Sequence, residues 1–228
     1  MPDHHDDTRD RDIELAAELQ RAFADALLAG DPSAAERVIR EAIDAGLTET
    51  VIDDHVIRPA LVLIGDLWAD GRVTVAEEHL ATSISTGIVA LLREAFRVAR
   101  RRAAHCVLLA GVQGERHIVG LEMAASVIAH AGYDVRLFGA DVPVRDIGPA
   151  IARHHPAVVG FTSASALTAI NLPSAFDAVL LAAPATGIVV GGRGVDDRVA
   201  TSWDVVICRH VSEAVEQIDA LVKRARHN

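Results

Sequence analysis

The chain has 228 residues, of which 50% are hydrophobic and 24% are charged, a balance typical of a globular protein. Its formal net charge is -10 and its Lys and Arg residues form no dominant block, which argues against direct binding to nucleic acid. No apolar run approaches the roughly 20 residues that cross a bilayer, and the first residues lack the apolar segment of a signal peptide. We therefore expect a cytoplasmic protein without membrane attachment.

Apolar residues at helical spacing in the first hundred residues predict four helices. Thr74 and Glu77 have the spacing of a capping box, which begins a long last helix that ends near Arg101. Short connections between four helices predict an up-down bundle. We place this bundle at residues 11–102, after a disordered tail of residues 1–10.

The pattern changes in the second part of the chain, residues 103–228. Short β-rich runs alternate there with segments able to form helices, which predicts a parallel sheet with helices on both faces. The five predicted strands cover residues 106–110, 135–138, 157–161, 187–190 and 204–208. We expect a flavodoxin-like α/β domain with strand order 2-1-3-4-5, whose ligands bind at the carboxyl ends of the strands. The expected fold class is thus a four-helix bundle followed by a five-stranded parallel α/β domain.

The loop after the first predicted strand is the most informative stretch. His117 lies two residues after Glu115 and three residues before Gly120. A carboxylate that hydrogen-bonds one ring nitrogen fixes the tautomer and raises the basicity of the other nitrogen, as metal-ligating histidines usually require. The spacing therefore predicts an imidazole that is offered to a metal centre.

Small residues follow two other predicted strands at the same end of the sheet. Thr162, Ser163 and Ser165 follow the third strand, and Gly191 and Gly192 follow the fourth. Each group alone is common in turns and helix caps. Their coincidence at one edge of the sheet favours a binding site.

Residues 105–225 resemble a cobalamin-binding domain, in which an Asp/Glu-x-His-x-x-Gly loop supplies the histidine beneath the cobalt. The resemblance implies that His117 is the lower axial ligand, in place of the dimethylbenzimidazole base, and that Glu115 orients it. It also implies contacts with the displaced base and its nucleotide tail from Gly120, Thr162, Ser163, Ser165, Gly191 and Gly192. Most of the family has Asp where this chain has Glu115.

A second group of residues lies in the predicted bundle. Trp68 ends the third predicted helix, and Glu78 and His79 follow the start of the fourth, so a short loop makes them neighbours. By themselves these residues have a simpler interpretation, a tryptophan that closes the bundle end beside a solvated Glu-His pair.

Taken together, Trp-x9-Glu-His followed by Glu-x-His-x-x-Gly resembles the light-sensing module of the CarH/LitR type of adenosylcobalamin photoreceptor. The resemblance implies that adenosylcobalamin binds base-off between a helical cap and the α/β domain, with Trp68, Glu78 and His79 beside the adenosyl group. It implies a receptor and not an enzyme: light cleaves the cobalt–carbon bond, and a homo-oligomer changes its conformation or assembly to signal to a partner.

Two departures from that family affect the expected output. Transcription-factor members carry a helix-turn-helix domain for which we find no counterpart, so we do not expect direct DNA binding. Ala69 stands where some members have a histidine that ligates cobalt after the adenosyl group leaves. The illuminated state is therefore expected to use another upper ligand.

Three alternatives remain open. A bilin such as biliverdin is a candidate second chromophore, although Cys106 and Cys208 both lie in predicted strands and offer no covalent anchor. A corrinoid methyl carrier of a methyltransferase system would share the helical cap and the histidine loop, but a face covered by Trp68 would obstruct methyl transfer. A flavodoxin-like interaction module that binds no corrin is the third.

Overall fold

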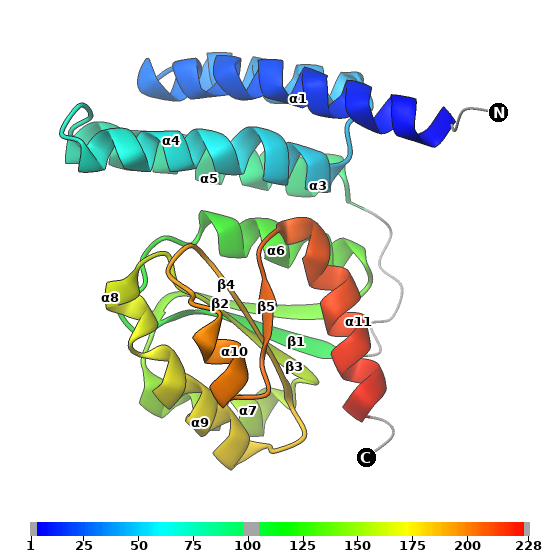
Figure 1. Cartoon of the computed structure of the whole chain (residues 1–228), viewed down its shortest axis with the longest axis vertical. Coiled ribbons are helices and arrows are strands. Elements are labelled where there is room, and N and C mark those ends of the chain that lie inside the picture. The colour runs from blue at the N-terminus through cyan, green and yellow to red at the C-terminus, as the bar shows by residue number, and fades with distance from the viewer. Residues whose placement is uncertain (1–3, 98–104, 226–228) are drawn as a thin grey trace. The chain divides into compact units, whose positions relative to one another are not determined.

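The computed structural model of the protein describes residues 4–97 and 105–225. The chain forms two compact units, the helical unit Met1–Arg97 and the α/β unit Val98–Asn228 (Figure 1). The expected fold class is confirmed, since helices precede a five-stranded parallel sheet flanked by further helices. Within the described residues, no helix has the length and apolar character needed to cross a membrane.

Amphipathic helices build the helical unit around a core that includes the buried Phe23, Ile39 and Ile64. The predicted capping box is confirmed: the Thr74 hydroxyl accepts a bond from the Glu77 N–H at 3.3 Å, and the Glu77 carboxylate accepts one from the Thr74 N–H at 2.7 Å. The elements are α1 (His4–Leu28), α2 (Pro32–Asp44), α3 (Glu49–Ile52), the π-helix η1 (Asp53–Ile57), α4 (Arg58–Ala69) and α5 (Val75–Ala95).

The ends of the helical unit differ from the sequence prediction. The expected tail of residues 1–10 is wrong from His4 onward, because α1 begins there and no glycine or proline interrupts the chain between Pro2 and Gly30. The last helix ends at Ala95 and not near Arg101, since the backbone of Phe96 already leaves helical geometry. Arg101 itself lies outside the described residues.

The third predicted helix is divided by the π-helical turn η1. Pro59, just after this turn, has no N–H to donate to a backbone carbonyl, which disfavours a regular α-helix there. The turn carries Asp53, which is buried, and one of its carboxylate oxygens has no hydrogen-bond partner. Burial, together with the charges of Glu49 and Asp54, raises the pKa of Asp53 to about 8.

The α/β unit contains the predicted parallel sheet, with the observed order β2-β1-β3-β4-β5. This order confirms the expected doubly wound topology, with a switch point between β1 and β3. The strands are β1 (Cys106–Val112), β2 (Asp134–Val142), β3 (Val158–Thr162), β4 (Gly187–Gly191) and β5 (Val206–Cys208). The helices are α6 (Val119–His130), α7 (Val144–His154), α8 (Ala166–Ala169), α9 (Leu172–Ala182), α10 (Arg198–Ser202), the 3-10 turn η2 (Val211–Glu213) and α11 (Ala214–Ala225).

Alternate side chains of the central strands build a hydrophobic core on each face of the sheet. Val107 and Leu109 of β1 pack in one cluster with residues of α6 and α11. Leu108 and Ala110 pack in the other cluster with residues of α7 and α9. Because both faces are covered, the strands read as continuous apolar runs and their carboxyl ends remain the open edge for a site.

We predict that Asp53→Asn stabilises the helical unit and removes part of its pH dependence. The folded pKa of Asp53 is about 8, raised from 3.8, so the folded state retains a proton that the unfolded chain releases. Stability from this group is complete below pH 3.8 and is lost as the pH rises towards 8. At pH 8 the variant should gain on the order of 2 kcal/mol in urea unfolding. Asp25→Asn, an exposed control on α1, should change neither the free energy of unfolding at pH 8 nor its dependence on pH. An equal gain in stability in both variants would contradict the prediction.

Candidate functional site

The site is built at the carboxyl ends of β1, β3 and β4. The histidine loop (residues 113–118) joins β1 to α6, the hydroxyl loop (residues 162–165) follows β3, and the glycine turn (residues 191–194) follows β4. Gly111, Thr162 and Gly191 pair in register across the three strands. The sheet therefore brings together the three segments that the sequence singled out.

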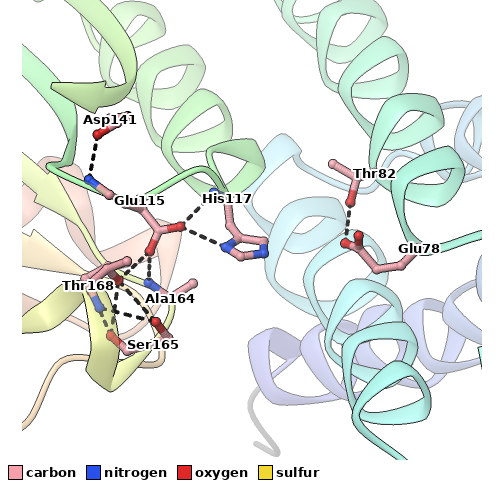
Figure 2. A network of polar contacts seen from close by, with 10 residues as sticks. Glu78, Thr82, Glu115, His117, Asp141, Ala164, Ser165 and Thr168 are labelled. Carbon is pink, nitrogen blue, oxygen red and sulfur yellow. Dashed lines mark hydrogen bonds and ion pairs between the residues drawn. The ribbon is translucent and has the colours of Figure 1, made fainter. Parts of the chain in front are cut away.

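The carboxylate of Glu115 is the centre of this arrangement (Figure 2). Its Oε1 accepts bonds from the backbone N–H and the ring Nδ1 of His117, at 2.7 and 2.8 Å. Its Oε2 accepts bonds from the Ala164 N–H at 2.5 Å and the Thr168 hydroxyl at 2.9 Å. One side chain thus joins the histidine loop to the hydroxyl loop and to α8.

Glu115 is ionised throughout the physiological range. Its side chain is fully buried, and burial alone would raise the pKa, but hydrogen bonds from His117, Ala164 and Thr168 outweigh that effect and lower the pKa to about 2. The ionised carboxylate favours the proton on Nδ1 of His117, so the neutral ring carries its unshared electron pair on Nε2. This is the nitrogen that a metal would use.

The His117 ring is 66% exposed although its partner Glu115 is buried. Figure 2 shows the ring extending from the loop, with one nitrogen facing Glu115 and the other on the far side. The described residues contain no group of three or more His, Cys, Asp or Glu side chains able to hold a metal ion. A single oriented imidazole therefore fits a metal whose other ligands come from a cofactor ring.

The hydroxyl loop is held by its own hydrogen bonds. Ser163 is buried, and its hydroxyl lies 2.6 Å from the Thr168 hydroxyl and 3.1 Å from the Ser165 carbonyl oxygen. The Ser165 hydroxyl caps α8 by accepting the Thr168 N–H at 3.4 Å. In this arrangement Ser163 and Ser165 support Thr168, which in turn holds Glu115.

The glycine turn lies against the backbone of the hydroxyl loop. A Cβ atom on Gly192 would meet the Ser163 carbonyl oxygen at 2.1 Å, and the backbone φ there is +106°. A Cβ atom on Gly194 would lie 2.4 Å from the backbone of Ser165. These glycines are required by the packing of the protein itself, because no side chain fits between the two segments.

Gly120 has a different environment. It lies in the first turn of α6, and a Cβ atom there would meet nothing within 4 Å. Protein packing therefore gives no reason for a glycine at this position.

Two of the residues singled out in the helical unit, Glu78 and His79, contact each other. Glu78 accepts a bond from the Thr82 hydroxyl at 2.9 Å and lies 2.6 Å from Nδ1 of His79. Trp68, near the end of α4, is 48% exposed. Thr82 was not anticipated, although its position four residues after Glu78 on a helix is the signal that would have found it.

In the α/β unit, Thr168 and Asp141 take part in the site although neither was among the predicted site residues. Thr168 supplies a hydroxyl to Glu115, and Asp141 binds the histidine loop through its backbone N–H and its side chain. Thr168 follows β3 and Asp141 lies near the end of β2, so both are placed at this edge of the sheet. The hydrogen bond from the Ala164 backbone N–H to Glu115 could not be predicted from the sequence.

Family models describing B12 binding domains match residues 19–93 and, separately, residues 105–219. The chain belongs to the family of B12-binding domains. The match over residues 105–219 contains the Glu115–His117 pair, the hydroxyl loop and the glycine turn.

Two curated relatives are similar to this chain in sequence. The HTH-type transcriptional repressor CarH of Myxococcus xanthus is 31% identical over 169 residues, which cover 74% of this chain and 55% of the repressor. The trimethylamine corrinoid protein of Methanosarcina barkeri is 23% identical over 160 residues, which cover 69% of this chain and 72% of that protein. The chain thus spans just over half the length of the repressor.

The fold is shared with solved corrinoid proteins. The monomethylamine corrinoid protein of Methanosarcina barkeri superposes with a TM-score of 0.78 and 13% identity, over 89% of this chain and 98% of that one. At this identity the likeness establishes the architecture, a helical part followed by an α/β part, and leaves the activity to be argued from the residues.

Two glycine substitutions should separate packing from ligand contact. We predict that Gly192→Ala lowers the free energy of unfolding by about 2–4 kcal/mol, because it combines a backbone clash with an unfavourable φ. Gly120→Ala should leave stability unchanged or raise it by up to about 1 kcal/mol, since alanine favours a helix. Urea unfolding of the protein without cofactor measures both, and a comparable loss of stability in the two variants would show that the packing argument is wrong.

Proposed function

We propose that this protein binds adenosylcobalamin base-off, with His117 as the lower axial ligand, and acts as a light receptor. The observation that carries the proposal is the Glu115–His117 pair, in which a buried, ionised carboxylate fixes Nδ1 and presents Nε2 on an exposed ring. Membership of the B12-binding family supports the choice of cofactor.

Each residue of the α/β unit has a defined task in this proposal. Glu115 orients the imidazole and holds a proton on Nδ1, which leaves Nε2 to bind the metal. The displaced base is contacted by one or more of Thr162, Ser163 and Ser165. The nucleotide tail passes beside Gly191 and Gly192. Gly120 gives the tail room beside α6, which is consistent with the open space around its Cβ position.

We assign the upper side of the cofactor to the helical unit as a cap. An exposed indole plane such as Trp68 suits a nucleoside base, and the carboxylate of Glu78, held by Thr82 and His79, suits ribose hydroxyls. When bound, adenosylcobalamin supplies a cobalt–carbon bond that visible light breaks. Trp68, Glu78 and His79 would then lose the group that they hold, which biases the cap between two positions.

The proposed output is a change in homo-oligomeric assembly that signals to a partner protein, in the manner of a receptor and not of an enzyme. Similarity over the shared region to the transcriptional repressor CarH supports a regulatory role. Because Ala69 offers no ligand, water, His79 or another group would bind cobalt once the adenosyl group has left. Biliverdin as a second chromophore would be bound noncovalently, since burial raises the pKa of both thiols, Cys208 to about 11 and Cys106 in the same direction.

A second candidate function is a corrinoid methyl carrier. Sequence similarity to the trimethylamine corrinoid protein of Methanosarcina barkeri, 23% identical over 69% of this chain, supports this alternative. Both functions need the same lower ligand, so they differ only in what happens on the upper side. A carrier must admit a partner enzyme's methyl donor, whereas a receptor must hold an adenosyl group.

Reconstitution in the dark tests the choice. The protein is loaded with adenosylcobalamin, and absorption spectra and size-exclusion profiles are recorded before and after green light. A spectral change with altered elution supports the receptor. A bound corrinoid with unchanged assembly, followed by transfer of the methyl group of methylcobalamin to a thiol, supports the carrier. Absence of corrinoid binding contradicts both.

His117→Ala should remove the lower ligand without unfolding the exposed loop. We expect adenosylcobalamin affinity to fall by at least about tenfold, a loss of at least about 1.4 kcal/mol, and the spectrum to lose its imidazole-ligated form. The control is His55→Ala, which removes an exposed histidine from the helical unit and should leave both unchanged. Equal affinity of His117→Ala and the unmodified protein would rule out the assigned ligand.

Trp68→Ala tests the assignment of the cap. The lower ligand is untouched, so corrinoid should still bind, with affinity reduced by no more than about tenfold. The light-driven change in elution should be lost, because the variant has no indole whose contact with the adenosyl group is broken by light. Leu63→Ala, another exposed apolar residue of α4, is the matched control. A normal light response in Trp68→Ala would place the sensing contact elsewhere.

A further inference from the structure

We infer that Asp141 is the positioning residue of the histidine loop, and this inference rests on the proposed role of His117. Asp141 lies on β2, whose neighbour β1 leads directly into the loop. Its backbone N–H donates to the Glu115 carbonyl oxygen at 2.8 Å. Its Oδ1 accepts the Gly114 N–H at 2.6 Å (Figure 2). One residue therefore binds two consecutive residues of the loop just before His117.

The two strands are irregular at the point where this contact forms. The pairing of β1 with β2 shifts register between Leu109 and Ala110 and again between Ala110 and Val112. Such bulges redirect the backbone next to functional sites. A Cβ atom on Gly111 would lie 3.2 Å from the Glu115 carbonyl oxygen and 3.3 Å from the Gly139 carbonyl oxygen, so the loop and β2 are in close contact there.

The side-chain hydrogen bond to Gly114 explains why Asp141 is an acid although its backbone conformation favours glycine. Its φ is +51°, a left-handed conformation that glycine adopts freely and that Asp and Asn tolerate better than other residues. A glycine would satisfy the backbone but would leave the Gly114 N–H without its Oδ1 acceptor. The side chain is therefore retained for its hydrogen bond to the loop, at some cost in backbone conformation.

This contact completes a clamp around Glu115 from two directions. Ala164 and Thr168 hold the carboxylate from the β3 side, and Asp141 holds the main chain of the same residue from the β2 side. The carboxylate alone cannot fix the His117 ring if the main chain beneath it moves. Loss of the Asp141 side chain should therefore reduce the fraction of His117 that reaches cobalt, while corrinoid can still bind through other contacts.

Three substitutions separate backbone conformation from hydrogen bonding. Asp141→Asn retains both the tolerance of positive φ and an Oδ1 acceptor, Asp141→Gly retains only the conformation, and Asp141→Ala retains neither. Asp134→Ala, at the other end of β2, is the control. Each protein is loaded with cobalamin reduced to Co(II), and electron paramagnetic resonance measures the fraction with nitrogen splitting from an axial imidazole.

We expect the Asn variant to match the unmodified protein and the Gly variant to lose at least half of the nitrogen-coordinated fraction, with total corrinoid binding within threefold. The Ala variant should lose as much or more. Hydrogen exchange without cofactor gives a second readout. Amides of residues 113–118 should exchange at least threefold faster in the Gly variant than in the unmodified protein. Their exchange rates should be unchanged in the Asn variant and in Asp134→Ala. Asp141→Gly with normal coordination and normal exchange would overturn the inference.

The two readouts also distinguish the failure of this inference from the failure of the proposed function. Absence of nitrogen splitting in the unmodified protein would refute His117 as the ligand. The exchange data would then still decide whether Asp141 fixes the loop. Normal splitting in the unmodified protein, with no effect of the Gly variant in either readout, would refute only the role of Asp141.

Discussion

The site depends on the solvation of one buried anion, the carboxylate of Glu115. A carboxylate removed from water must accept hydrogen bonds from the protein or be neutralised. Glu115 accepts four, from His117 twice and from Ala164 and Thr168 once each. These donors belong to two βα segments that are far apart in sequence, so the orientation of one exposed imidazole is fixed by the topology of the whole sheet. The hydrogen bonds that the buried carboxylate of Glu115 must accept therefore also hold the proton of His117 on Nδ1.

The parts of the site that are local in sequence could be predicted, and the parts that depend on chain folding could not. Glu115 and His117 are two residues apart on a loop after an apolar strand, so their contact follows from spacing. Thr168 reaches Glu115 only because α8 turns back immediately after β3, and the left-handed φ of Asp141 follows from bulges between β1 and β2. Neither the turn nor the bulges leave a periodic signal in the residues. The alternation of strands and helices was predictable from β-rich runs between helical segments, and the strand order was expected as the default for a five-stranded sheet of this kind.

In the helical unit, too, the regular helices could be predicted from the sequence and the irregular turn could not. Its helices and the capping box at Thr74 follow from apolar spacing and helix-start signals. The π turn (Asp53–Ile57) does not, because its wider winding leaves no signal in the spacing of the residues, and it carries a buried acid, Asp53. Burial is the main cause of the raised pKa of Asp53, because it favours the protonated form, and the charges of Glu49 and Asp54 add to it.

The choice between a light receptor and a methyl carrier rests on the helical unit and not on the sheet. An imidazole oriented by Glu115 can bind cobalt whether the cofactor carries an adenosyl or a methyl group, so the geometry around His117 does not decide between the two. The helical unit carries an exposed indole at Trp68 and a carboxylate at Glu78 that two neighbours hold in place. A methyl group offers neither a ring to stack on the indole nor hydroxyls to donate to the carboxylate, whereas a nucleoside offers both. Chemical complementarity to a nucleoside is therefore the reason to favour adenosylcobalamin and the receptor that this cofactor implies.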